Sequence, residues 1–392
     1  GWDLRRLFRK CFHDMADAQR PDGLVPNIAP EYTVFWDAFR DSPEWGSALI
    51  LAAWQHHAFT GDAAPLREHY DAMTRYLGYL GSRASGHVVD HGLGDWYDVG
   101  PEPPGYAQLT PVALTATATY YEDARKLAAI ARVIGRAADA EEHGRLAAEI
   151  REAFNRKFLD PGTGRYASGS QTAQAMPIAL GLVPEDCRAR AVAALVDDIE
   201  GRGFAVSAGD VGYRYVLRAL ADAGRSDVIA RMVRQRDRPG YAYQLEQGAT
   251  SLTEAWDANR RNSQNHFMLG QVVEWFYQDL AGLGVDPDEP GFRNTLVRPQ
   301  PVAGVSWAEA SHDSPRGPVR VRWESGGGGF RLVLTVPPNA TATVFMPSVE
   351  PGAVSESGGP ASRAEGVEFL RREGDREVFR VEAGAYDFRS PW

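Results

Sequence analysis

The sequence predicts a mainly α-helical domain, arranged as a toroid of paired helices, followed by a small antiparallel β-sandwich. Up to about residue 284, apolar residues recur at spacings of three and four, which is the helical period. After a breaker-rich segment at 286–291, apolar and polar residues alternate, as in half-buried strands. Several long connections between the helices are dense in aromatic and acidic residues, which suits loops that line one mouth of a toroid. We therefore expect two domains, residues 1–284 and 285–392.

Each helix is predicted from a stripe of apolar residues. One stripe runs from Leu66 to Leu80 and another from Leu127 to Ile134, and each can bury one face of a helix. Connections rich in Gly, Pro and Asp separate the segments. We expect about eleven helical segments. They include one that begins near Leu7 and others near 42–59, 62–83, 110–136, 138–159, 171–181, 187–200, 210–223, 225–235 and 263–283.

The strands are predicted from alternation with a period of two between turn residues. This pattern occurs at 319–323, 330–336, 342–346, 377–381 and 386–388. Short alternating strands that Gly, Pro and Asn separate are typical of a β-sandwich. We expect about 100 residues of this kind.

Composition and charge exclude several classes of protein. The 392 residues carry a formal net charge of −10 and no basic run, so we expect no nucleic-acid partner. No stretch approaches the ~20 apolar residues of a membrane-spanning helix. Two cysteines, far apart at Cys11 and Cys187, make neither a disulfide framework nor a metal cluster, and no nucleotide motif occurs. We expect no cofactor; the sequence shows no leader and assigns neither a compartment nor an oligomeric state.

The first cluster with chemical potential is Trp36-Asp37 followed by Glu44-Trp45. Aromatic rings stack on the C–H faces of sugars, and carboxylates supply the acid and base of glycoside hydrolysis. The alternative is an ordinary helix start, with a cap and a proline at 42–43. That alternative leaves both Trp residues unexplained.

The second cluster is Gly94-Asp95-Trp96. Glycine permits close backbone approach, so an Asp-Trp pair beside it suits a sugar site. The alternative is a turn with a packed Trp. A weaker candidate pair, Asp210 and Tyr213, lies further along, where Asp210 can instead be a helix N-cap.

The third cluster begins at Gln244 and contains Glu254, Trp256 and His266. Glu254 stands among small and apolar residues, which makes it a candidate for a tuned pKa. The alternatives are a capping box at 251–254 and a hydrogen-bonded core histidine.

These strings together resemble glycoside hydrolase family 78, the α-L-rhamnosidases. The resemblance covers nearly the whole chain and rests on four strings in the family's order, of which each alone is common. They are Asp-Ser-Pro-Glu-Trp-Gly at 41–46, Gly-Asp-Trp at 94–96, Gly-Ala-Thr-Ser-Leu-Thr-Glu-Ala-Trp-Asp at 248–257 and Ser-Gln-Asn-His at 263–266. The family's fold is an (α/α)6 barrel, the six-hairpin toroid, flanked by β-domains. Its members are inverting enzymes.

The resemblance implies roles for individual residues. Glu254 becomes the general base that activates water, and Trp45, Asp95 and Trp96 line the rhamnose pocket. His266 binds a sugar hydroxyl or orients the water. The implied partner is a rhamnose-containing glycan or glycoside.

One part of the family's pattern is absent. The general acid is a Glu in a Cys-Pro-x-Arg-Glu-x-x-Gly-Trp motif, which occurs nowhere in residues 1–392. Gly1-Trp2 is not the end of that motif, because a helical pattern follows at once. We expect the acid and the first barrel helix to lie in a missing upstream segment. We therefore expect this polypeptide to be weak or inactive, since removing an acid catalyst costs about 10²–10⁴ in rate.

Two other functions compete with hydrolysis. A polysaccharide lyase on the same scaffold would cleave beside a uronate, with Tyr213, Arg214 and His266 as its groups. A rhamnose-binding remnant would keep the aromatic pocket without the chemistry.

Overall fold

The computed structural model describes residues 3–392, so the interpretation of Gly1-Trp2 lies outside the described residues. Contacts divide the chain into two compact units. The helical unit contains Arg6–Trp54 and Ala63–Gln271, and the strand-rich unit contains Val272–Trp392 with Gln55–Asp62. The division at residues 284 and 285 stays a prediction.

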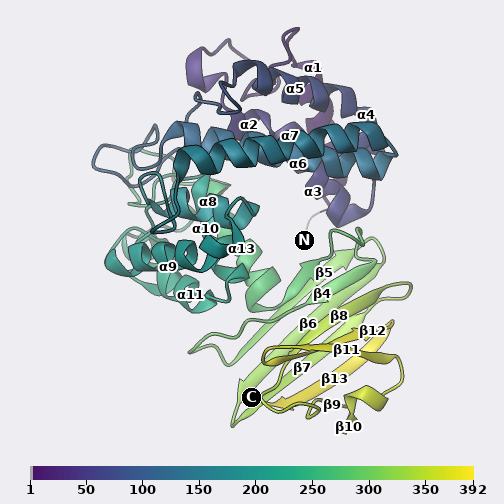
Figure 1. Ribbon diagram of the computed structural model, residues 1–392. Coiled ribbons are helices and arrows are strands. Elements are labelled where there is room, and N and C mark those ends of the chain that lie inside the picture. Colours follow the sequence, from purple (N-terminus) through teal and green to yellow (C-terminus); the bar gives the residue numbers. More distant parts are fainter. Residues whose placement is uncertain (1–2) are drawn as a thin grey trace. The chain divides into compact units, whose positions relative to one another are not determined.

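The helical unit is a succession of helices joined by long loops (Figure 1). Its helices are α1 (Arg5–Asp17), α2 (Pro43–Gly46), α3 (Ala48–Thr60), α4 (Ala64–Glu68), α5 (Tyr70–Arg83), α6 (Val112–Ile134), α7 (Ala137–Phe158), α8 (Gln171–Leu180), α9 (Glu185–Gly201), α10 (Gly212–Asp222), α11 (Ser226–Arg234) and α12 (Tyr241–Glu246). The ends of α3 and α1 extend into the other unit. Two short strands, β1 (Leu159–Asp160) and β2 (Arg165–Tyr166), pair between α7 and α8.

The helices pair as hairpins with one inner and one outer member. In α6 every residue from Ala113 to Ala124 is buried, whereas α7 buries only a stripe that includes Ile150 and Phe154. The same contrast separates α8, buried along almost its whole length, from α9. The inner helices α6, α8 and α10 contact one another in turn. A helix that is buried all round belongs to the interior, and an amphipathic one covers it.

Local sequence ends these helices where predicted. Gly135 follows α6 and Gly181 follows α8, both in the left-handed conformation that favours glycine. The Ser170 hydroxyl accepts the N–H of Ala173 at 3.2 Å and caps α8.

The predicted helix at 263–283 is wrong in its first part. The backbone of His266 donates to the Leu252 carbonyl at 2.8 Å, so this segment pairs with a neighbouring loop instead of coiling. Regular structure begins at a 3-10 turn, Phe267–Gln271, and continues as α13 (Val272–Trp275) and a π-helical turn, Phe276–Leu280. The short α12 was not predicted, because one and a half turns give too few positions for a periodic stripe.

The strand-rich unit is a β-sandwich. One sheet has the order β10-β9-β13-β7-β6-β5 and the other β11-β12-β8-β4-β3. The pair β4–β8 is parallel and the other strand pairs of these sheets are antiparallel, so the predicted antiparallel sandwich contains one parallel pair. The strands are β3 (Leu283–Val285), β4 (Asn294–Val297), β5 (Trp307–Ser314), β6 (Gly317–Gly326), β7 (Gly329–Val336), β8 (Thr341–Pro347), β9 (Ser355–Glu356), β10 (Gly359–Pro360), β11 (Val367–Glu373), β12 (Arg376–Val381) and β13 (Gly384–Pro391); a 3-10 turn spans Ala361–Arg363.

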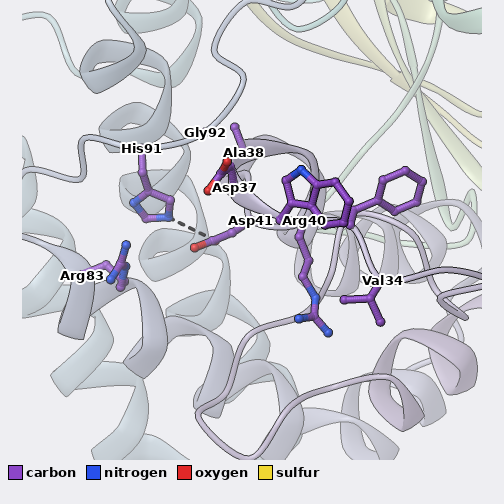
Figure 2. A pocket seen from close by; sticks show the side chains of 10 residues that line it. Val34, Asp37, Ala38, Arg40, Asp41, Arg83, His91 and Gly92 are labelled. Atoms are coloured by element: carbon purple, nitrogen blue, oxygen red, sulfur yellow. Dashed lines mark hydrogen bonds and ion pairs between the residues drawn. The ribbon is translucent and has the colours of Figure 1, made fainter.

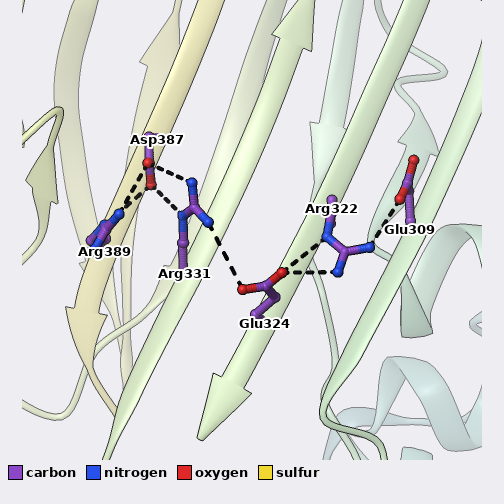
Figure 3. Close-up of polar contacts among 6 residues, drawn as sticks. All are labelled: Glu309, Arg322, Glu324, Arg331, Asp387 and Arg389. Carbon is purple, nitrogen blue, oxygen red and sulfur yellow. Dashed lines mark hydrogen bonds and ion pairs between the residues drawn. The ribbon is translucent and has the colours of Figure 1, made fainter.

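The two sheets share one apolar core and expose charges on the other side. Buried Trp323, Leu332 and Phe388 from one sheet pack in a cluster with Val344 and Phe379 from the other. On the solvent side, alternating Arg and acidic residues cross β5, β6, β7 and β13 as a ladder (Figure 3). Exposed pairs of this kind contribute about 0.2–1 kcal/mol each, so the apolar core carries most of the stability.

Across residues 3–392, the helices lack the combination of length and apolar content required to cross a bilayer.

Candidate active site

Three of the loops that the sequence singled out meet in the helical unit. The backbone N–H of Asp210 donates to the Trp96 carbonyl at 2.7 Å. The indole N–H of Trp256 donates to the Ala208 carbonyl at 2.9 Å. Loops around residues 95, 209 and 256, far apart in sequence, are therefore tied into one assembly.

Asp95 holds these loops together, and we call it the clamp. It is 0% exposed, and its carboxylate accepts hydrogen bonds from the backbone N–H of Gly209 at 2.9 Å and of Gly212 at 2.8 Å, and from the Thr172 hydroxyl. Burial raises the pKa of Asp95 to about 6, although these donors stabilise its ionised form. Because three internal donors occupy its oxygens, Asp95 positions the loop rather than presenting a carboxylate to solvent.

The backbone at Gly209 approaches the loop around Trp96 so closely that glycine is required there. A β-carbon built on it would lie 2.1 Å from the Trp96 carbonyl oxygen and 2.6 Å from the backbone nitrogen of Asp98. Backbone atoms cannot swing aside, so only glycine fits here.

Glu254 lies in an irregular loop, and the capping-box alternative is wrong because no helix begins there. Its backbone N–H donates to the Ser263 carbonyl at 2.9 Å, and its Oε2 accepts the N–H of Ser263 at 3.0 Å. The Tyr97 hydroxyl is also hydrogen-bonded to Glu254, and burial followed by the charge of Glu254 raises the pKa of Tyr97. His266 belongs to the same paired segment, and its ring stacks on the ring of Phe267.

Asp210 is the buried carboxyl beside Glu254. Its Oδ1 is buried and has no hydrogen-bond partner among residues 3–392. Burial, followed by the negative charges of Asp95 and Glu254, raises the pKa of Asp210 to about 8. At neutral pH Asp210 therefore carries a proton and can donate a hydrogen bond.

The proton on Asp210 predicts a pH-dependent stability. The pKa of an unfolded Asp lies near its ordinary value of 3.8, whereas the pKa of folded Asp210 is about 8. Its contribution is thus complete below the unfolded pKa and is lost as the pH rises toward 8, by at most about 1.4 kcal/mol per pH unit. Asp210→Asn should flatten that decline in the free energy of unfolding, measured by urea melts at pH 5 and pH 8. The same substitution at exposed Asp257 should leave the wild-type slope, and an unchanged slope in Asp210→Asn would contradict the assignment.

Two predicted pocket residues are buried supports instead. Trp256 is 1% exposed and Tyr213 is 0% exposed. Their rings lie 4.9 Å apart, edge to face, and Tyr241 packs against both. Gln244 is also buried, with its Nε2 lacking a hydrogen-bond partner among residues 3–392.

Trp96 is half-buried and forms, with Phe39, Tyr97 and Tyr106, a group of rings that we call the aromatic rim. Its ring contacts Phe39 at 5.3 Å, Tyr106 at 5.5 Å and Tyr97 at 5.2 Å between centroids. Phe39 and Tyr106 are exposed. These rings offer apolar faces of the kind that sugars stack on.

Glu44 and Trp45 are half-buried at the start of α2. The Thr115 hydroxyl donates to Oε1 of Glu44 at 2.6 Å, while Oε2 is buried without a hydrogen-bond partner among residues 3–392. Burial raises the pKa of Glu44 to about 7, and the charges of Asp95 and Asp41 act in the same direction. Like Asp95 and Asp210, Glu44 is thus a carboxyl whose pKa is raised.

Trp36 and Asp37 line a separate pocket of about 560 Å³ (Figure 2). Trp36 is 77% exposed. Arg83 and His91 line the same pocket, and His91 Nε2 lies 3.1 Å from Asp41 Oδ1. The neighbouring Phe39 touches Trp96, so this pocket adjoins the aromatic rim.

Sequence reasoning missed Tyr97 and Asp98. The carboxylate of Asp98 accepts the N–H groups of Gln108 at 3.0 Å and Leu109 at 2.7 Å, and so fixes the far side of the turn. Both residues directly follow Gly94-Asp95-Trp96, and the available signal was a second acidic residue, Asp98, three positions after Asp95.

Comparisons with known proteins assign a family to each of the two parts of the chain. Residues 2–280 match the bacterial alpha-L-rhamnosidase 6 hairpin glycosidase domain, and residues 284–360 match the bacterial alpha-L-rhamnosidase C-terminal domain. An alpha-L-rhamnosidase of Streptomyces avermitilis is 31% identical over 98% of this chain and 36% of its own length. A crystal structure of Streptomyces avermitilis alpha-L-rhamnosidase complexed with L-rhamnose has a TM-score of 0.89 at 31% identity, covering 98% of this chain and 36% of that one. The alpha-L-rhamnosidase structure from Dictyoglumus thermophilum has a TM-score of 0.90 at 32% identity, covering 99% of this chain and 44% of that one.

The chain spans between 33% and 43% of the length of the curated relatives it matches. The predicted fold class, a six-hairpin toroid followed by a small domain of mostly antiparallel sheets, is confirmed. With both domain descriptions matched in order, the chain belongs to the bacterial alpha-L-rhamnosidase family.

Proposed function

We propose that this chain carries the base side of the active site of an inverting α-L-rhamnosidase, with Glu254 as the general base. The observation that carries the proposal is the setting of Glu254. Ser263 and Tyr97 orient its carboxylate, and protonated Asp210 lies beside it. A base held in one orientation beside a polar, aromatic-lined surface is what water activation on a sugar requires.

The rest of the proposed site binds rhamnose. Trp96 and Trp45 supply apolar surface, and His266 and Glu44 supply groups for the sugar hydroxyls. The predicted pocket residues Asp95, Asp210, Trp256, Tyr213 and Gln244 act beneath the surface, because they are buried. The general acid lies outside residues 1–392 in this proposal, since the motif that carries it in the family does not occur in them.

The proposal is tested with 2,4-dinitrophenyl α-L-rhamnoside. Its leaving group departs without protonation, so base-dependent hydrolysis can be measured without the general acid. The expected first product is β-L-rhamnose, seen by NMR before mutarotation, because inverting enzymes deliver water to the opposite face. Initial formation of α-L-rhamnose would exclude the inverting mechanism.

The two alternatives predict other products. A lyase acting beside a uronate would form a new C=C bond that absorbs in the ultraviolet, but the hydroxyl of Tyr213, one of its proposed groups, is buried. A rhamnose-binding remnant would bind the sugar equally well after Glu254→Gln and would not hydrolyse the aryl rhamnoside.

Trp36 is proposed to hold the sugar that follows rhamnose. Trp36→Ala should weaken binding of a rhamnosyl-glucose disaccharide about 2–10-fold, the loss of one aromatic contact, and leave binding of free L-rhamnose unchanged. Calorimetric titration measures both affinities. Trp307 in the β-sandwich is also exposed, and Trp307→Ala is the control that should change neither. Equal loss for both ligands would place Trp36 at the rhamnose pocket itself.

A further inference from the structure

Two histidines and a glutamate lie close to one another in the helical unit, and none of them belongs to the site described above. His13 lies on α1, and Glu68 and His69 lie at the corner between α4 and α5. One potential ligand atom from each lies within 4.8 Å of the other two. The rings of His13 and His69 meet edge to face at 4.7 Å, and His13 Nε2 is 4.0 Å from Glu68 Oε2.

His69 is the buried member of this cluster. It is 6% exposed, and its Nε2 has no hydrogen-bond partner among residues 3–392. A buried imidazole nitrogen without a partner is costly. The unprotonated nitrogen of an imidazole is the atom that binds metals.

The two oxygens of Glu68 are used unequally. Arg9 donates a hydrogen bond to Oε1 at 2.9 Å and a longer one, at 3.3 Å, to Oε2, the oxygen that faces His13. Arg9 can therefore remain on Oε1 while Oε2 binds a cation, as outer hydrogen bonds do for carboxylate ligands in metal sites. The neighbouring charges are the cation of Arg9 and the carboxylate of Asp17.

We propose that His13, Glu68 and His69 form a Zn²⁺ site that joins α1 to the α4–α5 corner. Two imidazoles and one carboxylate are a donor set that Zn²⁺ accepts, with water completing four-coordination. Bonds of about 2.0–2.2 Å bring ligand atoms to roughly 3.4 Å from one another. The exposed side chains of His13 and Glu68 reach that spacing by small rotations.

The site has a structural consequence for α1. Phe12 is the only buried residue of this helix within the described part of the chain. A metal bond from His13 would hold a lightly packed helix in place, and binding to the folded state alone raises its stability.

The test is titration of ZnCl₂ into the metal-stripped 392-residue chain, followed by calorimetry and by the melting temperature. We expect one saturable Zn²⁺ per chain and a rise in Tm with zinc. His13→Gln and Glu68→Gln should each weaken binding at least about tenfold, since even second-shell changes cost 10–100-fold. Both side chains are exposed, so these variants keep the fold. Co²⁺ bound in place of Zn²⁺ should give visible absorption bands typical of a low coordination number. These bands should be absent in His13→Gln.

His87 provides the matched control. It is a partly exposed histidine 3.6 Å from the carboxylate of Glu149, and it does not belong to the His13, Glu68 and His69 cluster. His87→Gln should bind zinc like the wild type. The absence of a saturable site, or equal zinc affinity in wild type and His13→Gln, would overturn the proposal. Neither result bears on rhamnoside hydrolysis, because the site shares no residue with it.

Discussion

Glu254→Gln is expected to lower kcat for 2,4-dinitrophenyl α-L-rhamnoside by about 10²–10⁴-fold, the usual loss of one general base. The amide keeps the size of the side chain and can still accept the Ser263 N–H, but it cannot take a proton from water. KM should change little, since the sugar contacts remain. Initial rates on the 392-residue chain, or on a longer protein that contains it, measure both constants.

Two controls make the Glu254 result specific. Glu246 on α12 is a nearby glutamate that pairs with Arg236, and Glu246→Gln should leave the rate unchanged. In Glu254→Ala, added azide should attack the anomeric carbon as the aryloxide leaves and yield β-L-rhamnosyl azide. A Glu254→Gln protein as fast as the wild type would remove Glu254 from the mechanism.

Asp95→Ala is expected to lower the free energy of unfolding by about 3 kcal/mol, because each unsatisfied buried donor costs about 1–3 kcal/mol. The N–H groups of Gly209 and Gly212 and the Thr172 hydroxyl would all lose their acceptor. Relief of the buried charge offsets part of that cost, as the raised pKa of Asp95 indicates. Urea unfolding measures the change.

Asp90 is the control for Asp95. It lies in the same connection but is exposed, so Asp90→Ala should cost less than about 0.5 kcal/mol. If Asp95→Ala were equally mild, the three hydrogen bonds would not be what holds the loops together. The same variant should also slow hydrolysis, because the clamped loop carries Asp210 beside Glu254.

The sequence predicted the helices well because inner and outer members leave different periodic patterns. The stripe of α5, with Tyr70, Met73 and Leu77, appears as predicted on a buried face. Periodicity failed at residues 263–266, where pairing with the Leu252–Glu254 loop replaced the helix. Tertiary hydrogen bonds there outweigh a weak local preference.

For the candidate site, the sequence located the loops but not the depth of each side chain. Asp95, Trp256 and Tyr213 have the residue types of a sugar pocket, yet all three are buried supports. Burial depends on which segments meet, and Asp95 meets Gly209 and Gly212, more than 110 positions away. No local pattern carries that information.

By itself, the sequence determined a helical toroid, a following β-sandwich and the loops that hold the carboxylates, because periodicity and motif order are local properties of the chain. Only the tertiary structure decided that Asp95 clamps while Asp210 stays protonated beside Glu254, and that His13 meets His69. The physical reason is that pKa, hydrogen bonding and metal ligation depend on desolvation and on partners remote in sequence, which become neighbours only on folding.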